Sequence, residues 1–166
     1  MMALAPVVFL AFIVAQRLSE LVIARRNTAR LLAEGAYEVG AAHYPVMVAM
    51  HCLWIVCLVV FGYDQTVFYG WLVVFAVLQV LRVWILATLG RRWTTRIIVL
   101  PEPLVAGGPF RYFKHPNYIL VVAEIIVAPM VLGLLWVAVI FTLLNAAMLW
   151  VRIGVEDRAL APLRKT

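Results

Sequence analysis

Long apolar segments separated by short polar ones dominate the chain. They predict five helices, which run from about Ala3 to Leu32, Ala42 to Phe61, Phe68 to Leu89, Pro116 to Gly133 and Leu134 to Val151, and the spanning part of the first ends near Arg25 and Arg26. Several of these segments approach or exceed the ~18–20 residues that a helix needs to cross a hydrocarbon core of ~30 Å. The pattern therefore predicts an all-α integral membrane protein with five transmembrane helices, folded as a single membrane domain over residues 1–166.

Composition supports this fold class and leaves little room for a separate soluble domain. Of the 166 residues, 66% are hydrophobic and only 13% are charged, and the mean hydropathy is +1.03. A soluble domain of ordinary composition is far more polar. The net charge of +6 comes from basic residues that flank the hydrophobic segments and form no separate basic domain. We therefore attribute this charge to membrane orientation and expect no nucleic-acid partner.

The positions of Lys and Arg predict the orientation of the chain. Basic residues follow the first, third and fifth predicted helices, and the opposite helix ends carry none. Cytoplasmic loops are enriched in such residues, so we expect a multi-pass cell-membrane protein with its N-terminus outside and residues 93–114 in the cytoplasm. The residues concerned are Arg25, Arg26, Arg30, Arg91, Arg92, Arg96, Arg111, Lys114, Arg152, Arg158, Arg164 and Lys165.

The polar segment Gly107–Tyr118 differs most from its apolar surroundings. It combines glycines and prolines with Arg, Lys, His and four aromatic rings. Pro116 is suited to the first turn of a helix, which would place backbone N–H groups and a positive dipole end beside His115. A cofactor with a carboxylate and an adenine ring would find donors, cations and stacking faces here. Upstream, Ile97–Leu100 is apolar and β-branched, and predicts either a short interfacial strand or a flap over a lipid tail.

Four ionisable residues interrupt the apolar segments: Arg17, Glu20, Arg82 and Glu124. Each lies roughly 7 to 14 Å from the cytoplasmic end of its helix at ~1.5 Å per residue, and Asn145 falls in the same band. Charges at such depth are costly unless they are paired or face a cavity. We expect one shared network, which either fixes the register of the helices or forms the polar floor of a binding cavity.

No group of residues predicts a metal site. His43 and His51 in the second helix have no Asp, Glu, Cys or His partner at a spacing that suits a metal ion.

Two motifs give the chain a resemblance to a known family. Gly-Pro-Phe-Arg-Tyr-Phe-Lys-His-Pro-Asn-Tyr, residues 108–118, resembles the Gly-x-Tyr-x-x-x-Arg-His-Pro-x-Tyr motif of the isoprenylcysteine carboxyl methyltransferase family. Arg152 followed by Glu156 resembles the second motif of that family. The resemblance covers Thr94 to Leu160, and the layout is similar to that of small bacterial members with five helices. It implies three N-terminal helices in residues 1–92 and a methyltransferase region in residues 93–166. That region would comprise a cytoplasmic cofactor-binding loop and a C-terminal helical hairpin, in a bacterial inner membrane.

The resemblance also implies S-adenosylmethionine as the cofactor and names the residues that contact it. Arg152 matches an Arg that points toward the substrate and is the expected catalytic residue. Phe110 stands where the family has Tyr, Lys114 where it usually has Arg, and Asp157 where many members have a second Glu. The implied cofactor-binding residues are Glu102, Pro103, Leu104, Val105, Phe110, His115, Pro116, Asn117, Tyr118 and Glu156.

The chemistry of the residues suits methyl transfer, and other functions stay open. Transfer from a sulfonium requires an acceptor held close and in line, with water excluded, and aromatic rings can hold the sulfonium and the adenine. We expect an O-methyltransferase that acts on a carboxylate or acidic hydroxyl of a lipophilic substrate, with membrane lipids around it and no obligate protein partner. An alkylpyrone-type polyketide lipid is an alternative acceptor. A small transporter, a lipid-binding protein or an assembly factor without chemistry are alternative classes, although the chain lacks the paired repeats typical of transporters.

Overall fold

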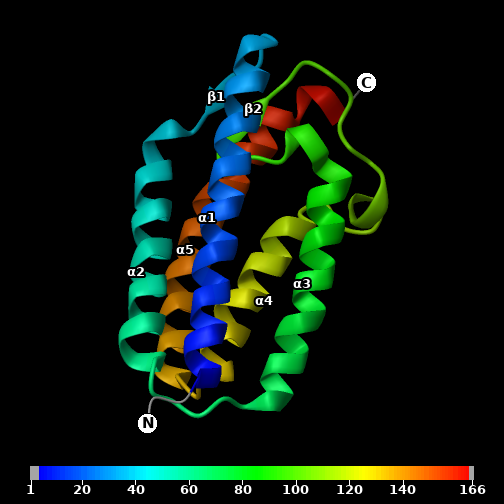
Figure 1. The fold of residues 1–166 in the computed structure, drawn as a ribbon. Coiled ribbons are helices and arrows are strands. Elements are labelled where there is room, and N and C mark those ends of the chain that lie inside the picture. Colours follow the sequence, from blue (N-terminus) through cyan, green and yellow to red (C-terminus); the bar gives the residue numbers. More distant parts are fainter. Residues whose placement is uncertain (1–3, 165–166) are drawn as a thin grey trace.

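A bundle of five helices forms the body of the protein in a computed structural model that describes residues 4–164 (Figure 1). The two termini lie at opposite ends of the bundle. The predicted first residue of the first helix, Ala3, and the basic Lys165 lie outside the described residues. The helices are α1 (Leu4–Ala33), α2 (Tyr44–Gly62), α3 (Tyr69–Leu89), α4 (Pro116–Val131) and α5 (Leu135–Leu160), and the strands are β1 (Tyr37–Val39) and β2 (Ile97–Val99). Single turns of 3₁₀ helix cover Ala41–His43, Gly90–Arg92, Gly108–Arg111 and Pro162–Arg164.

Four of the helices, α1, α2, α3 and α5, are long and apolar enough to cross a membrane. The remaining helix, α4, has 16 residues, so it measures only about 24 Å at 1.5 Å per residue. It ends two residues before the predicted end at Gly133, because Pro129 lies in its last turn and the chain then reverses. Gly133 has a φ of 69°, and a Cβ there would lie 2.9 Å from the ring of Phe68. The fold is thus confirmed as helical and membrane-spanning, and the fifth span stays a prediction.

Helix α5 is longer than the apolar pattern indicates. The hydrophobic segment ends near Val151, but the helix continues without interruption to Leu160. Its last turns carry Arg152 and Glu156, whose side chains bond to residues on other elements instead of to solvent alone. The motif residues of the C-terminal region therefore stand on a rigid helix that rises from the membrane part of the bundle.

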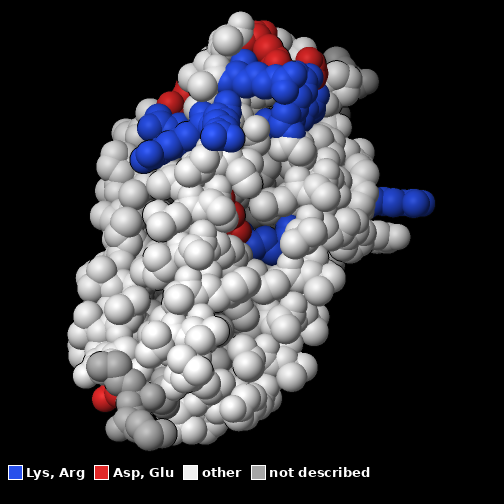
Figure 2. All heavy atoms as spheres, viewed as in Figure 1, with Lys and Arg blue, Asp and Glu red and all other residues white. Residues whose placement is uncertain are grey.

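Apolar side chains fill the bundle near the N-terminal end and also cover its outer face. Leu58, Ala128, Val131 and Val137 are fully buried there among other core residues. Trp150 is 85% exposed, as expected for a side chain that faces lipid. Figure 2 shows a mostly uncharged face, with most Lys and Arg side chains gathered toward the end of the bundle where the C-terminus lies. This distribution agrees with the orientation predicted from the sequence, which remains a prediction.

The strands β1 and β2 form a small antiparallel sheet at the end of the bundle where the C-terminus lies (Figure 1). Tyr37 pairs with Val99, and Val39 pairs with Ile97. Of the two structures left open for Ile97–Leu100, the strand is correct for Ile97–Val99. Its partner β1 was not predicted, because the pairing joins segments about sixty residues apart and three residues carry no periodic signal of their own.

Arg96 ties this sheet to the rest of the structure. Its Nη1 donates to both carboxylate oxygens of Glu38, at 2.9 and 2.7 Å. Its guanidinium lies 4.4 Å from the ring centroid of Tyr44, which adds a cation–π contact. Hydrogen bonding to Glu38 raises the pKa of Arg96 further above its ordinary value. These contacts hold residues 93–96 over the end of the bundle that is predicted to face the cytoplasm.

The four ionisable residues of the apolar segments form one network, as the sequence predicted. Arg82 on α3 donates to Glu124 on α4 and, at 3.1 Å, to both oxygens of Glu20 on α1. Arg17 bonds to Glu20 at 3.2 Å and to Glu124 at 2.7 Å. Gln79 adds a hydrogen bond of 3.1 Å to Glu124. Because the network joins three helices, it fixes how they sit against one another, and it also borders a cavity described below.

Candidate active site

The site begins where α4 begins. Pro116 occupies the first turn of α4 and is buried, where its missing N–H costs nothing because the first N–H groups of a helix have no partner within it. His115 immediately precedes the helix and turns its ring toward α5. The ring stacks on that of Tyr118 at a centroid distance of 5.4 Å and an interplanar angle of 24°. His115 and Tyr118 thus present one aromatic wall at the start of α4.

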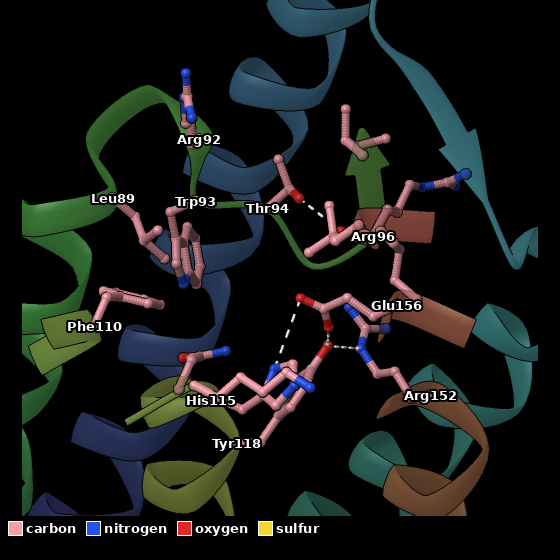
Figure 3. Close-up of a pocket in the computed structure, with 15 residues that line it drawn as sticks. Leu89, Arg92, Trp93, Thr94, Arg96, Phe110, His115, Tyr118, Arg152 and Glu156 are labelled. Atoms are coloured by element: carbon pink, nitrogen blue, oxygen red, sulfur yellow. Dashed lines mark hydrogen bonds and ion pairs between the residues drawn. The ribbon is translucent and has the colours of Figure 1, made fainter. Parts of the chain in front are cut away.

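Helix α5 supplies the opposite side of the site. Arg152 and Glu156 are four residues apart and therefore share a helix face. The Tyr118 hydroxyl donates a short hydrogen bond to Glu156 and accepts one of 2.8 Å from Arg152 Nε. Figure 3 shows Arg152 and Glu156 meeting the Tyr118 hydroxyl from α5. One phenol therefore connects the two residues of the C-terminal motif to the His-Pro-Asn-Tyr motif on α4.

Arg152 is only 5% exposed, and its remaining donors are also engaged. Its Nη2 donates to the backbone carbonyl of Thr95 at 2.8 Å, and its Nη1 lies 3.1 Å from Met47 Sδ. The guanidinium carbon lies 5.6 Å from the ring centroid of Tyr118. A buried cation of this kind is held by neutral groups and by a shared tyrosine, and no carboxylate among residues 4–164 bonds to it directly, so it retains charge for an anionic ligand.

Asp157 organises the exposed side of the site. Its two carboxylate oxygens accept from His115 Nε2 at 3.0 Å and from Lys114 Nζ at 2.7 Å. Glu156 also lies 3.9 Å from His115 Nδ1. Lys114, at the position where the related motif has Arg, therefore serves at least in part to pair with Asp157.

Two cavities meet at these residues. The loop cavity, defined here as the space bordered by residues 89–118 and the end of α5, has a main part of about 140 Å³ and an adjoining lobe of about 270 Å³. The membrane cavity, of about 250 Å³, lies among α1, α2, α4 and α5. Five residues line both the main part of the loop cavity and the membrane cavity, and we call them the partition: Trp93, Thr94, Asn117, Tyr118 and Arg152.

The residues around the loop cavity fit the cofactor that the motifs imply. Two buried polar atoms in the partition, Asn117 Oδ1 and Trp93 Nε1, have no hydrogen-bond partner among the described residues. Phe110, His115 and Tyr118 supply stacking faces, and Lys114 and Arg92 supply positive charge. Gly108, with a φ of 56°, leaves no room for a side chain, because a Cβ would lie 2.6 Å from Thr88 Oγ1. The cavity therefore offers unpaired donors and acceptors, aromatic surface and cations to an adenosyl amino acid.

The structure brings most of the predicted residues together. Phe110, His115, Asn117, Tyr118, Arg152 and Glu156 all line the main part of the loop cavity, and Leu104 and Val105 line its lobe. Glu102 lines neither part, and its carboxylate pairs with Arg91 and Arg92. Pro103 is also outside the lining and accepts a hydrogen bond from Arg92 through its carbonyl. Pro116 lies beneath the site, where it starts α4.

Sequence reasoning missed several residues of the site. Trp93 and Thr94 were treated only as part of a non-spanning segment, yet both belong to the partition. An aromatic residue directly after the basic Arg91-Arg92 pair is typical of a membrane interface and could have drawn attention to Trp93. The contacts of Arg152 with the Thr95 carbonyl and with Met47 had no sequence signal, because they depend on how β2 and α2 pack against α5.

Comparisons with known proteins show the family of the chain. Residues 71–162, more than half of the chain, match the isoprenylcysteine carboxyl methyltransferase (ICMT) family. The chain belongs to this family. Membership indicates a membrane methyltransferase. The matched region contains the whole of α4 and α5, both motifs and all five partition residues.

The chain is also similar to an uncharacterized protein, YpbQ, of Bacillus subtilis (strain 168). The two are 37% identical over 157 residues, which cover 91% of this chain and 94% of YpbQ. No solved structure matches the chain. The similarity to YpbQ extends over nearly the full length, so it includes the α1 and α2 segments that the family match leaves out.

Proposed function

We propose that the protein is an integral membrane O-methyltransferase that uses S-adenosylmethionine to methylate a carboxylate or an acidic hydroxyl of a lipophilic acceptor. One observation carries the proposal: a polar cavity and a membrane-embedded cavity share a partition that contains the buried cation Arg152. A polar cofactor and a lipid must meet at one point in such a reaction, and the partition is a point where the two environments adjoin.

The residues have distinct roles in this proposal. Glu156, Asn117, His115 and Phe110 hold the cofactor in the loop cavity, where polar and stacking contacts are available. When bound, S-adenosylmethionine supplies a methyl group on an electrophilic sulfonium. Arg152 orients the acidic oxygen of the acceptor, because its guanidinium is buried and bonds to no carboxylate in the part of the chain that the structure describes. Trp93 and Tyr118 separate the two cavities and keep water away from the acceptor oxygen.

The acceptor needs little help from a general base. A carboxylate is ionised at neutral pH, and an acidic enol such as that of an alkylpyrone-type lipid loses its proton readily. Positioning and exclusion of water then account for most of what the protein contributes. This agrees with a site in which two polar side chains of the partition, Arg152 and Tyr118, act by hydrogen bonding.

The structure gives less support to transport or to simple lipid binding. The buried charges Arg17, Glu20, Arg82 and Glu124 are paired with one another at one depth, and they do not form a series of sites across the bundle. A lipid-binding protein would not need the second, polar cavity on the other side of Arg152. The methyltransferase proposal accounts for both cavities.

Calorimetric titration of the purified protein with S-adenosylmethionine and with S-adenosylhomocysteine tests the proposal. We expect saturable binding of both compounds, and weaker binding by an Asn117→Leu variant that remains folded. Arg26→Gln, on the exposed face of α1 and outside both cavities, serves as the matched control and should bind as the wild type does. Absence of binding to the folded wild-type protein would overturn the proposal.

A further inference from the structure

Asn145 is a buried polar residue that the proposed reaction does not use. It lies in the middle of α5, is 1% exposed, and lines the membrane cavity. Its Nδ2 has no hydrogen-bond partner among the residues that the structure describes. A buried amide donor without a partner costs about 1–3 kcal/mol, and a leucine would pack in an apolar helix without that cost. Because Asn145 lines the cavity and its donor is unpaired, a ligand oxygen that reaches this amide would satisfy it.

The other unpaired atoms divide by location. Trp93 Nε1 and Asn117 Oδ1 belong to the partition and border both cavities. Thr142 Oγ1 and Trp54 Nε1 are also unpaired but line neither cavity. Asn145 alone among these five borders only the membrane cavity. It is therefore a separate polar point, away from the cofactor side.

Helix geometry gives the spacing between Asn145 and the partition. Asn145 and Arg152 are seven residues apart on α5, which corresponds to two turns and about 10 Å along the axis. Both line the membrane cavity, as do Met148 and Leu149 between them. The cavity is thus polar at both ends of this stretch and apolar in between, and the long Arg152 side chain shortens the gap that a ligand must bridge.

The charges beside Asn145 determine what kind of group can bind there. Arg17, Glu20 and Arg82 line the same cavity, but together with Glu124 they make two positive and two negative charges that are already paired. The floor of the cavity therefore has no net charge with which to hold a second anion. The amide N–H of Asn145 suits a neutral acceptor, such as a carbonyl or hydroxyl oxygen.

The open side of the cavity indicates where a lipid tail would run. Leu18 on α1 and Val48 and Cys52 on α2 line the cavity and are exposed on the surface of the bundle. An alkyl tail can leave between α1 and α2 into the surrounding lipid, while the polar head stays between Asn145 and Arg152.

We propose that the membrane cavity recognises an acceptor lipid whose head carries two oxygen functions, an acidic one placed at Arg152 and a neutral hydrogen-bond acceptor placed at Asn145. This deepens the proposed function and rests on it for the identity of the reacting oxygen. Asn145 acts as a specificity-determining residue: it selects against lipids that have the acidic group but lack the second oxygen, because the buried amide would then stay unpaired.

Two pairs of probe lipids test this inference, each pair differing by one oxygen. The first is an alkylresorcinol and the meta-alkylphenol of the same chain length, and the second is a β-hydroxy fatty acid and the unsubstituted acid. Quenching of intrinsic tryptophan fluorescence measures binding to the purified protein independently of methyl transfer, and titration with S-adenosylmethionine is run in parallel. We expect the wild type to bind the two-oxygen member of at least one pair roughly two- to tenfold more tightly, as one hydrogen bond of about 0.5–1.5 kcal/mol implies.

Asn145→Leu should abolish that preference and leave S-adenosylmethionine affinity unchanged. It should not lower the thermal stability, because it removes an unpaired buried amide; Asn145→Ala replaces it if the leucine variant fails to fold. Thr142→Val, which removes an unpaired hydroxyl from the same helix outside the cavity, is the matched control and should retain the preference. The inference is overturned if the wild type binds neither pair or shows no preference, or if the preference survives in the Asn145 variants. Loss of cofactor binding in the wild type would instead contradict the proposed function alone.

Discussion

The two polar clusters of this protein contain similar kinds of residue but differ in how completely those residues are paired. The buried network of Arg17, Glu20, Arg82 and Glu124 pairs every charge with an opposite one across three helices. The cluster around Arg152, Tyr118 and Glu156 is interrupted by a neutral phenol and borders cavities on two sides. Complete pairing leaves nothing for a ligand, whereas the second cluster keeps charge and unpaired atoms beside open space. A structural network differs from a candidate active site less in which polar residues it contains than in whether all of them already have partners.

The largest expected effect is on the structural network. Arg82→Leu removes one of the two cations that pair with Glu20 and Glu124, so both carboxylates must share Arg17 in a buried site where Glu124 is only 1% exposed. Removing one partner of a buried ion pair typically costs about 3–5 kcal/mol. We expect a markedly lower midpoint of thermal unfolding in detergent, with partial recovery in Arg82→Leu/Glu124→Leu. Gln79 lies on α3, as Arg82 does, and donates one hydrogen bond to Glu124. Gln79→Leu removes that bond and should cost only about 1 kcal/mol. Equal losses in all three variants would contradict the comparison.

The next effect concerns the cofactor side of the second cluster. Glu156→Gln removes the negative charge that meets the Tyr118 hydroxyl. If Glu156 binds S-adenosylmethionine by a charge-assisted hydrogen bond of about 1.5–3 kcal/mol, cofactor affinity should fall roughly ten- to a hundredfold. Calorimetric titration measures this change, and the unfolding midpoint should move little. Tyr118→Phe separates the role of the Glu156 charge from that of its hydrogen bond to Tyr118, since it removes only the hydroxyl that connects Glu156 to Arg152 and leaves both charges in place.

Substitution of Arg152 should lower methyl transfer more than cofactor affinity, the reverse of what we expect for Glu156. Arg152→Leu removes the buried cation that we assign to the acceptor, so methyl transfer should fall by about tenfold or more, with cofactor affinity nearly intact. Arg152→Lys should be only partly active, because an ammonium cannot reproduce the separate donations of Nε and Nη2 to Tyr118 and Thr95. Transfer of labelled methyl groups to an acceptor lipid provides the measurement. Loss of cofactor binding in folded Arg152→Leu, with Glu156→Gln unaffected, would reverse the two roles.

The smallest expected effect is at the exposed ion pair between Glu38 of β1 and Arg96, which directly precedes β2. The side chain of Arg96 is 40% exposed and that of Glu38 is 20% exposed. Exposed pairs contribute about 0–1 kcal/mol, so Arg96→Leu should change the unfolding midpoint by far less than Arg82→Leu does. High salt should reduce the difference between wild type and Arg96→Leu and should leave the Arg82→Leu effect largely unchanged. If Arg96→Leu lowered the unfolding midpoint as much as Arg82→Leu does, burial would not determine how much an ion pair contributes to stability.

Much of the candidate site could be predicted because its residues occur in two short motifs whose residue types and spacing indicate where they lie on a helix. His115 and Pro116 mark the start of α4, and the spacing of Arg152 and Glu156 places them on one face of a helix. Of the strip Glu102–Val105, only Leu104 and Val105 line the lobe of the loop cavity. Glu102 turns toward Arg91 and Arg92 instead, and no local pattern distinguishes a carboxylate that meets a ligand from one that meets a neighbouring arginine.

The sequence by itself determined the helical membrane fold, the order of the helices and the presence of a charge network at one depth, because apolar length and the cost of unpaired buried charge act locally along each helix. Only the tertiary structure decided that β1 pairs with β2, that Tyr118 joins Arg152 to Glu156, and that Asn145 lines a cavity while its Nδ2 has no partner among the described residues. These features depend on contacts between segments far apart in the chain. Their geometry is set by how the helices pack, which no residue pattern within a single segment specifies.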